Sequence, residues 1–266
     1  MKLSLLLLVT LLISSVSFAQ FDWSFNAVHN APSGKLANHL SPATGIGMGF
    51  SIKPFKKPGL WINLEGSMVS MVSFDRTLTL TSPTSPEVTT TTVNYNTNAD
   101  NFALTLRYEF RQNKKWNPYI SASLMRMWFK SSISIVDPQS EDECEYLEEK
   151  KVEGAGNWMF ASGGGIKYRL NKKTPADEDE HLNNVWIDLS VNFIRGSQIN
   201  YADMRSIQTM KPGELFLPSS TEAKPLGILY RDIHTNTTHE HHIVEIHNNS
   251  FRMIQFKLGL VLEGMR

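Results

Sequence analysis

The sequence predicts an all-β protein, an eight-stranded antiparallel up-and-down transmembrane β-barrel with long extracellular loops. Three observations predict this fold class. Eight segments of roughly ten residues alternate apolar and polar side chains, the connections between them are alternately long and short, and a short apolar leader precedes them all. A barrel that crosses an outer membrane produces this pattern, because one face of each strand meets lipid, the other meets a polar lumen, and the two ends meet different compartments.

Residues 1–19 have the three parts of a secretory signal peptide. Lys2 supplies the positive n-region, residues 3–13 supply the apolar h-region, and Ser17-Phe18-Ala19 fits the small-x-small cleavage rule. The apolar run is too short for a transmembrane helix, which needs about 20 residues. We therefore expect Sec-dependent export, cleavage after Ala19, and one barrel domain over residues 20–266.

Composition and charge limit the other possibilities. The chain of 266 residues holds 26 basic and 26 acidic side chains, and the leader removes one basic residue, so the remainder has a net charge of −1 and no broad basic field for nucleic acid.

Cys144 is the only cysteine, so an internal disulfide or a thiolate zinc site cannot form. It lies in an acidic stretch, residues 140–151, that we interpret as a solvated loop. No later run approaches the roughly 18 apolar residues of a membrane helix, so any crossing must use strands.

The first four segments each place apolar side chains at every second position. These residues are Phe21, Trp23, Phe25 and Ala27 in the first segment, Ile46, Met48, Phe50 and Ile52 in the second, Leu60, Ile62, Leu64 and Met68 in the third, and Phe102, Leu104, Leu106, Tyr108 and Phe110 in the fourth. A period of two specifies a strand with two unlike faces. The last three segments repeat the pattern, with Trp158, Phe160, Ile166, Tyr168 and Leu170, then Val185, Ile187, Leu189, Val191 and Phe193, then Ile254, Phe256, Leu258, Leu260 and Leu262.

The fifth segment, residues 119–136, is less regular. Leu124 shares a face with earlier apolar residues, but that face then meets Arg126, while Met125 and Met127 fall on the opposite face. One extra residue in a strand flips its phase, so we predict a β-bulge near Leu124 or Met125.

The connections fall into two classes. Residues 54–59, 111–118 and 171–184 are mostly short and each contain a Lys-Lys pair, whereas residues 30–43, 75–99, 137–157 and 196–249 are long. We therefore place the short turns and both termini in the periplasm and the long loops outside the cell. Residues 77–81 and 88–95 alternate again, so we expect the third and fourth strands to continue past the membrane as a ribbon with an exposed edge. A ten-stranded barrel, with residues 226–233 and 243–247 as an extra hairpin, stays an alternative.

The polar face of the strands favours a membrane barrel over a soluble one. It is rich in Gly and Ser and carries charges of both signs: Lys53, Glu65, Arg107, Glu109, Lys167, Arg169, Asp188, Lys257 and Glu263. Glycine weakens a solvent-facing strand, whereas small residues and paired charges fit the narrow lumen of eight strands. Aromatic residues near strand ends, among them Trp23, Trp61 and Tyr119, suit interfacial girdles, although Trp61 and Trp186 fall on the polar face by parity.

The leader, the eight segments, the glycine-rich residues 45–49 and 163–165, and the closing strand at 256–262 resemble small outer-membrane β-barrel proteins. The similarity is to the OmpA/OmpX-like group, described as porin family or outer membrane β-barrel domain proteins of Bacteroidota-type Gram-negative bacteria. It is one of pattern over residues 21–263. The resemblance implies a cell outer membrane location but fixes no activity, because the family has structural, adhesive and enzymatic members. Such barrels commonly finish on an aromatic residue, whereas this chain continues to Arg266.

Two groups of residues are candidates for chemistry. The longest loop holds His234, His239, His241, His242 and His247 with Glu240 and Glu245. Imidazole and carboxylate groups bind Zn, Ni or Cu, but this spacing matches no established ligand signature. Ser250, His247 and Glu245 have the composition of a hydrolytic triad, yet triads are recognised by geometry, and the chain has no G-x-S-x-G elbow. We therefore assign no catalytic residue, no cofactor and no metal ligand, and expect a protein that is not an enzyme.

These observations predict the general role of the protein but not a particular activity. We expect an outer-membrane protein with a lumen filled by side chains, and a structural or surface-interaction role. Its expected partners are outer-membrane lipid and an extracellular protein or glycan that binds loops 75–99 and 196–249, without nucleic acid, and we expect a monomer. The main alternative is a soluble secreted or periplasmic lipocalin-like barrel that binds a small apolar ligand. A lipid-modifying barrel hydrolase is the weaker one.

Overall fold

The computed structural model describes residues 20–54, 59–81, 88–111, 114–136, 146–153, 156–171, 184–209, 224–231 and 238–264. The leader, Cys144 and His234 lie outside the described residues, so cleavage after Ala19 stays a prediction. Within the described ranges, no helix is long and apolar enough to cross a membrane.

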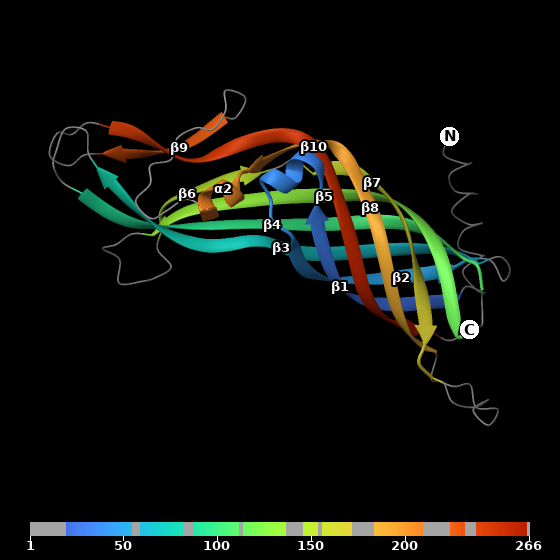
Figure 1. Ribbon diagram of the computed structural model, residues 1–266. Coiled ribbons are helices and arrows are strands. Elements are labelled where there is room, and N and C mark those ends of the chain that lie inside the picture. Colours follow the sequence, from blue (N-terminus) through green and yellow to red (C-terminus); the bar gives the residue numbers. More distant parts are fainter. Residues whose placement is uncertain are drawn as a thin grey trace, which may run out of the picture.

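Eight antiparallel strands close into a barrel (Figure 1). They are β1 (Gln20–Pro32), β2 (Ala43–Lys53), β3 (Leu60–Thr81), β4 (Val88–Glu109), β5 (Trp116–Val136), β7 (Asn157–Arg169), β8 (Val185–Ala202) and β10 (Thr238–Glu263). Each pairs with its neighbour along the chain, and β1 pairs with β10 from Asp22–Glu263 to Pro32–Met253. The predicted eight-stranded, antiparallel, up-and-down barrel is confirmed.

The two ends of the barrel differ. Gln20 and Glu263 lie at one end, which we call the lower end, and their side chains form a hydrogen bond there. The three short connections lie at the same end. At the other end β3, β4, β5, β8 and β10 continue well beyond β1, β2 and β7. The predicted continuation of the third and fourth strands is confirmed, since β3 and β4 stay paired as far as Thr81 and Val88.

Two shorter strands lie outside the barrel. β6 (Tyr146–Glu153) pairs with β5 above Met127, and β9 (Lys224–Arg231) pairs with the first part of β10. Part of the acidic stretch that we interpreted as a solvated loop is therefore a strand. β7 pairs with β5 only from Trp116 to Met127, so above that point the backbone of β5 needs another partner, which β6 supplies. The hairpin of the ten-stranded alternative also forms, but as an extension of β10 rather than as barrel wall.

Two helical turns close the barrel rim. η1 (Gly34–Asn38) connects β1 to β2, and α2 (Met204–Thr209) follows β8. Both turns lie near residues 246–253 of β10. This stretch separates the part of β10 that pairs with β9 from the part that pairs with β1. The Ser33 amide donates to the Arg252 carbonyl at 3.0 Å, and the Arg205 amide donates to the His39 carbonyl at 3.2 Å. These bonds join η1 to β10 and α2 to η1.

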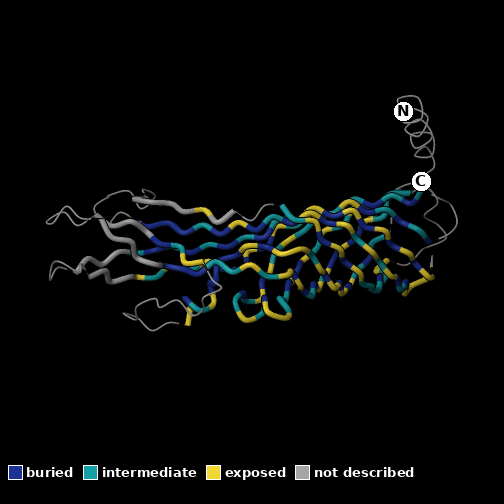
Figure 2. Tube along the Cα trace, turned by 90° about the horizontal axis from the view of Figure 1, so that it is seen from above, coloured by how far each residue is buried: buried dark blue, intermediate teal, exposed yellow. Residues whose placement is uncertain are grey.

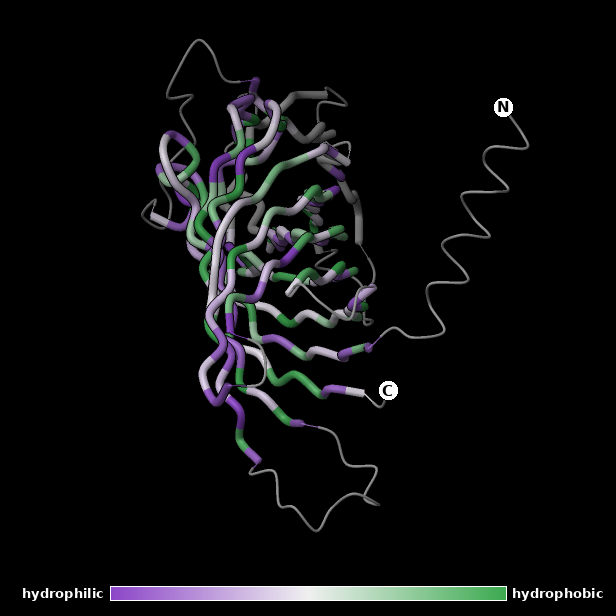
Figure 3. The backbone as a smooth tube through the Cα atoms, turned by 90° about the vertical axis from the view of Figure 1, so that its right-hand side faces the viewer, coloured by the Kyte–Doolittle hydropathy of each residue, from purple (hydrophilic) through white to green (hydrophobic). Residues whose placement is uncertain are grey.

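Buried and exposed residues alternate along the strands of the lower barrel (Figure 2), and so do hydrophilic and hydrophobic ones (Figure 3). Most of the buried residues there are polar, and the large exposed ones are apolar. All eight strands expose large apolar side chains, including Phe25, Met48, Leu64, Leu106, Ile120, Phe160, Leu189 and Leu258. On β4 and its end this band runs from Phe102 to Phe110. At about 3.4 Å per residue and a strand tilt of about 40°, it is about 20 Å high, close to the ~25 Å apolar band of membrane barrels.

Above this band both faces change polarity. The interior becomes apolar with Met125, Met127 and Met159, while the exterior gains charges such as Arg126 and Lys130. The predicted bulge near Leu124 is wrong, because β5 keeps one register against β4 and β7 through Leu124, Met125 and Arg126. The pattern along β5 changes because the interior turns from polar to apolar at this height, not because an extra residue shifts the register.

The upper part of the molecule has an apolar core of its own. We call this part the head; it comprises η1, β6, α2 and β9 together with residues 71–81, 88–99, 127–136, 197–202 and 238–251. Phe129 and Phe251 pack with ring centroids 5.5 Å apart, and the Tyr95 hydroxyl donates to the Ile243 carbonyl at 3.4 Å. Tyr95, Tyr201 and Phe251 are all at most 1% exposed. These contacts connect β4 and β5 to β10 across the head.

Candidate functional site

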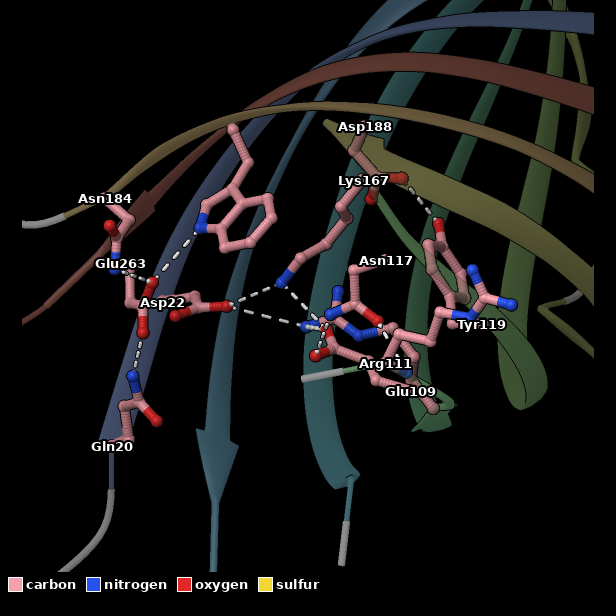
Figure 4. Close-up of polar contacts among 12 residues, drawn as sticks. Gln20, Asp22, Glu109, Arg111, Asn117, Tyr119, Lys167, Asn184, Asp188 and Glu263 are labelled. Carbon is pink, nitrogen blue, oxygen red and sulfur yellow. Dashed lines mark hydrogen bonds and ion pairs between the residues drawn. The ribbon is translucent and has the colours of Figure 1, made fainter. Parts of the chain in front are cut away.

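The lower lumen contains a network of charged side chains near the end where Gln20 and Glu263 lie (Figure 4). Lys167 Nζ lies 2.8 Å from Glu109 Oε1 and 3.4 Å from Asp22 Oδ2. Arg107 Nη2 lies 3.3 Å from Glu109 Oε1 and 3.5 Å from Asp22 Oδ2. All four side chains are at most 5% exposed. The network thus places two cations between two carboxylates, with little access to water.

Further polar contacts extend this network through the lower lumen. The Asn117 amide donates to Glu109 Oε2 at 2.7 Å, the Tyr119 hydroxyl donates to Asp188 at 2.8 Å, and Lys257 forms an ion pair with Glu65. The inward-facing charges described here balance, with acidic Asp22, Glu65, Glu109, Asp188 and Glu263 and basic Lys53, Arg107, Lys167, Arg169 and Lys257. A balanced, paired interior limits the cost of removing charges from water.

Two tryptophans belong to this network and not to an interfacial girdle. The Lys167 ammonium lies 5.2 Å from the ring centroids of both Trp61 and Trp186. The Arg169 guanidinium lies 4.6 Å from the Trp186 ring, whose Nε1 donates to Glu263 at 3.1 Å. Cations within about 6 Å of an aromatic face are attracted by its quadrupole. Trp61 and Tyr119, which sequence patterning assigned to the girdle, therefore face the lumen, while Trp23 and Trp158 face outward.

Two small cavities lie in the lumen. Residues of all eight barrel strands line the first, among them Glu65, Asn101 and Met125, and the lining of the second includes Arg107, Tyr119 and Asp188. Their volumes are about 10 and 20 Å³. A single water molecule needs at least about 10–15 Å³ measured in this way, so each cavity has room for one or two water molecules.

A second group of polar side chains lies at the rim, in the head. His39 follows η1, Asp203 precedes α2, and His247 is in β10. His39 Nδ1 lies 2.7 Å from Asp203 Oδ2, and the rings of His39 and His247 stack with centroids 4.0 Å apart. His247 Nε2 lies 3.6 Å from the same Asp203 oxygen and 3.4 Å from Glu245 Oε2. Three segments that are far apart in the sequence therefore meet at this rim cluster, which we define as His39, Asp203 and His247.

Burial shifts the pKa values of two side chains at the rim cluster, His247 and Tyr201. Burial, and then the neighbouring His39, lower the pKa of His247, against the opposing effect of the Asp203 and Glu245 carboxylates. Burial also raises the pKa of Tyr201, whose hydroxyl accepts a hydrogen bond from Asn249 at 2.8 Å. His247 therefore favours its neutral form, in which one ring nitrogen carries an open lone pair.

The residues that the sequence singled out are only partly brought together. His247 and Glu245 lie on one face of β10, whereas Ser250 is exposed on the opposite face, so these three residues do not form a triad. His239, His241 and His242 lie in the backbone ladder with β9, and their side chains are outside the described part of the chain. His39 and Asp203 were missed, because they are 164 residues apart and no local motif connects them.

Comparisons with known proteins give no family for this chain. No protein-family model matches this chain, and no curated protein matches it in sequence. Among solved structures it is similar to Neisserial surface protein A (NspA), with 12% identity over 92% of this chain and 97% of that chain, and a TM-score of 0.42. It is also similar to a major outer membrane protein from Thermus thermophilus, with 9% identity over 92% of this chain and 99% of that chain, and a TM-score of 0.44. The resemblance to the OmpA/OmpX-like group stays a prediction.

Proposed function

We propose that this protein is a non-conducting, non-catalytic outer-membrane β-barrel that acts at the cell surface through its head. The proposal rests on one observation: the polarity of the interior and that of the exterior both reverse along the barrel. The lower part has charges inside and large apolar side chains outside on all eight strands, whereas the head has an apolar interior. Water would favour the reverse arrangement in the lower part, so acyl chains are its natural surroundings.

The same observation disfavours the lipocalin-like alternative. A soluble barrel that binds an apolar ligand needs an apolar cavity, but the lower lumen is lined by residues such as Arg107, Asp188 and Lys257. Membrane fractionation tests this point. We expect the protein in the outer-membrane fraction and its extraction only by detergent. A purified protein that stays monodisperse in plain buffer contradicts the proposal.

The packed interior supports a lumen filled by side chains. The two interior cavities beside the charged network have volumes of only about 10 and 20 Å³. Eight strands enclose a space just wide enough for side chains, which agrees with this geometry. In planar lipid bilayers we expect no steady conductance from the purified protein, and a reproducible open channel would overturn this part of the proposal.

The head supports a surface-interaction role. Its apolar core holds the upper strands in a fixed arrangement, and β6 and β9 each have one strand neighbour among the described residues. A strand at the margin of a sheet is a place where an extended segment of a partner protein adds as a further strand. We propose an extracellular protein as the partner class, bound at the head, which includes most of the long loops 75–99 and 196–249.

The single cysteine gives a direct test of which side the head occupies. Cys144 lies in the connection between β5 and β6, so a maleimide that cannot cross membranes is expected to label it on intact cells. The matched control combines Cys144→Ala with Lys114→Cys, in the short connection after β4, and is expected to react only after the cells are lysed. The opposite result would place the head in the periplasm.

A further inference from the structure

The rim cluster has the composition and spacing of a metal site. One ligand atom each from His39, Asp203 and His247 lies within 4.8 Å of the other two. Two imidazoles and one carboxylate are the donor set of many zinc sites with three protein ligands, in which water takes the fourth position. The spacing of histidines along the sequence does not reveal this set, since its members come from three separate segments.

We propose that His39, Asp203 and His247 bind one divalent transition-metal ion, with Zn²⁺ preferred, and that the ion fastens the two rim turns to β10. The proposal goes beyond the surface role of the head, and it gives the rim cluster a function that the sequence alone did not assign.

The distances within the cluster suit a bound ion. With Zn–N bonds of about 2.0–2.1 Å and tetrahedral angles, neighbouring ligand atoms lie about 3.4 Å apart. His247 Nε2 and Asp203 Oδ2 are 3.6 Å apart, which is too long for a hydrogen bond but close to this separation. His39 Nδ1 and Asp203 Oδ2, at 2.7 Å, are hydrogen-bonded and need to separate by less than an ångström on that estimate. The stacked rings of His39 and His247 also need to rotate so that a nitrogen of each points at the ion.

An unsatisfied buried atom points to the same place. His247 Nε2 is buried and makes no hydrogen bond of good geometry; its nearest polar atoms are the carboxylate oxygens of Glu245 at 3.4 Å and Asp203 at 3.6 Å. Buried polar atoms in native proteins nearly always have a partner, so an orphan needs an explanation. A metal ion bound by this nitrogen would supply it.

The charges and supports around the cluster also fit. The carboxylates of Asp203 and Glu245 together offset the double charge of the ion. Asp203 Oδ1 accepts a hydrogen bond from the Ser206 amide at 3.0 Å, which caps α2 and leaves Oδ2 directed at the histidines. Partners that orient the ligands in this way are a regular feature of metal sites. Because the ligands come from segments beside η1, α2 and β10, a bound ion would add to the hydrogen bonds that already join these segments.

Zinc titration of the refolded protein in detergent micelles, by competition with a chromophoric chelator, tests the proposal. The key variant is Asp203→Asn, since Asn still caps α2 but gives up the charged ligand. His39→Gln is the second variant and lies at the more exposed edge of the cluster. One control replaces His239, His241 and His242 by Ala, and another is His29→Ala on the exposed face of β1. Circular dichroism and electrophoretic mobility verify that each barrel is folded.

We expect one tight Zn²⁺ per chain in the wild type and in both controls, and an affinity weakened at least 10- to 100-fold in Asp203→Asn and His39→Gln. Zinc should also raise the melting temperature of the wild type and not that of the two cluster variants. Crystals soaked in zinc should give an anomalous peak between the three side chains. Unchanged affinity in a folded Asp203→Asn or His39→Gln protein, or loss of the tight site in the triple-histidine control, would overturn the proposal.

Discussion

Replacing Lys167 by Met is expected to destabilise the folded barrel by about 3–5 kcal/mol. The Lys167 ammonium lies 2.8 Å from Glu109 and 3.4 Å from Asp22, and its side chain is 3% exposed. The substitution keeps most of the side-chain volume but leaves both carboxylates with Arg107 as the remaining cation nearby. Removing one partner of a buried ion pair is costly, because the other partner stays out of water without full compensation.

The magnitude follows from two opposing effects. With an effective dielectric constant of about 20, each of the two contacts contributes roughly 5–6 kcal/mol of attraction. The cost of taking the ammonium out of water offsets much of this sum, which leaves the net 3–5 kcal/mol that broken buried pairs typically show. Lys130 provides the matched control, since its ammonium lies 3.1 Å from Asp100 but its side chain is 61% exposed. Lys130→Met should cost at most about 1 kcal/mol.

The assay is urea unfolding of the protein in lipid vesicles, followed by tryptophan fluorescence. Trp61 and Trp186 lie 5.2 Å from the Lys167 ammonium, so they report on this part of the lumen. Adding Glu109→Gln to Lys167→Met removes one of the unpaired charges and should recover part of the lost stability. If Lys167→Met and Lys130→Met have equal free energies of unfolding, the reasoning about a dry, charge-paired lumen is refuted.

Three further predictions use the same unfolding assay. Gly163→Ala should cost about 1–3 kcal/mol, because the new Cβ would lie 2.8 Å from the Asn192 Cα and against the Val191 carbonyl oxygen, whereas Gly66→Ala, with 3.8 Å of clearance, should stay within about 1 kcal/mol of the wild type. Phe251→Ala should cost about 3–5 kcal/mol and make the head sensitive to protease, and an unchanged cleavage pattern would argue against a packed head core. Tyr95→Phe should cost less than about 1 kcal/mol, since its hydrogen bond is long at 3.4 Å, and a larger loss would mean that this bond matters more than its length implies.

The barrel could be predicted from the sequence because most strands show their two faces clearly. In β4, the alternation from Phe102 to Phe110 fixes both the strand and its lipid-facing side, and the structure agrees. A period of two identifies two faces without stating which surroundings each face meets. Sequence reasoning therefore read the change at Met125 as a slip in register, when it marks the height at which the interior turns from polar to apolar.

The rim cluster could not be predicted in the same way. His247 and Glu245 belong to a histidine-rich stretch that attracts attention, but His39 and Asp203 stand alone in two different connections. Their meeting depends on where β1 ends and on how β10 changes partners, both of which are properties of the closed sheet. The register shifts between Ser70 and Val72 and between Ser250 and Arg252 were not predicted either.

The charge pairs of the lumen have a consequence for how the chain enters a membrane. Asp22 on β1 meets cations on β4 and β7, and Glu65 on β3 meets Lys257 on β10, so partners sit on strands separated by up to 192 positions. A hairpin inserted alone would present these ions to hydrocarbon with nothing opposite them. The charges are fully paired only when the first and last strands come together. Partly inserted sheets are therefore higher in free energy, and assembly should proceed as one concerted transition.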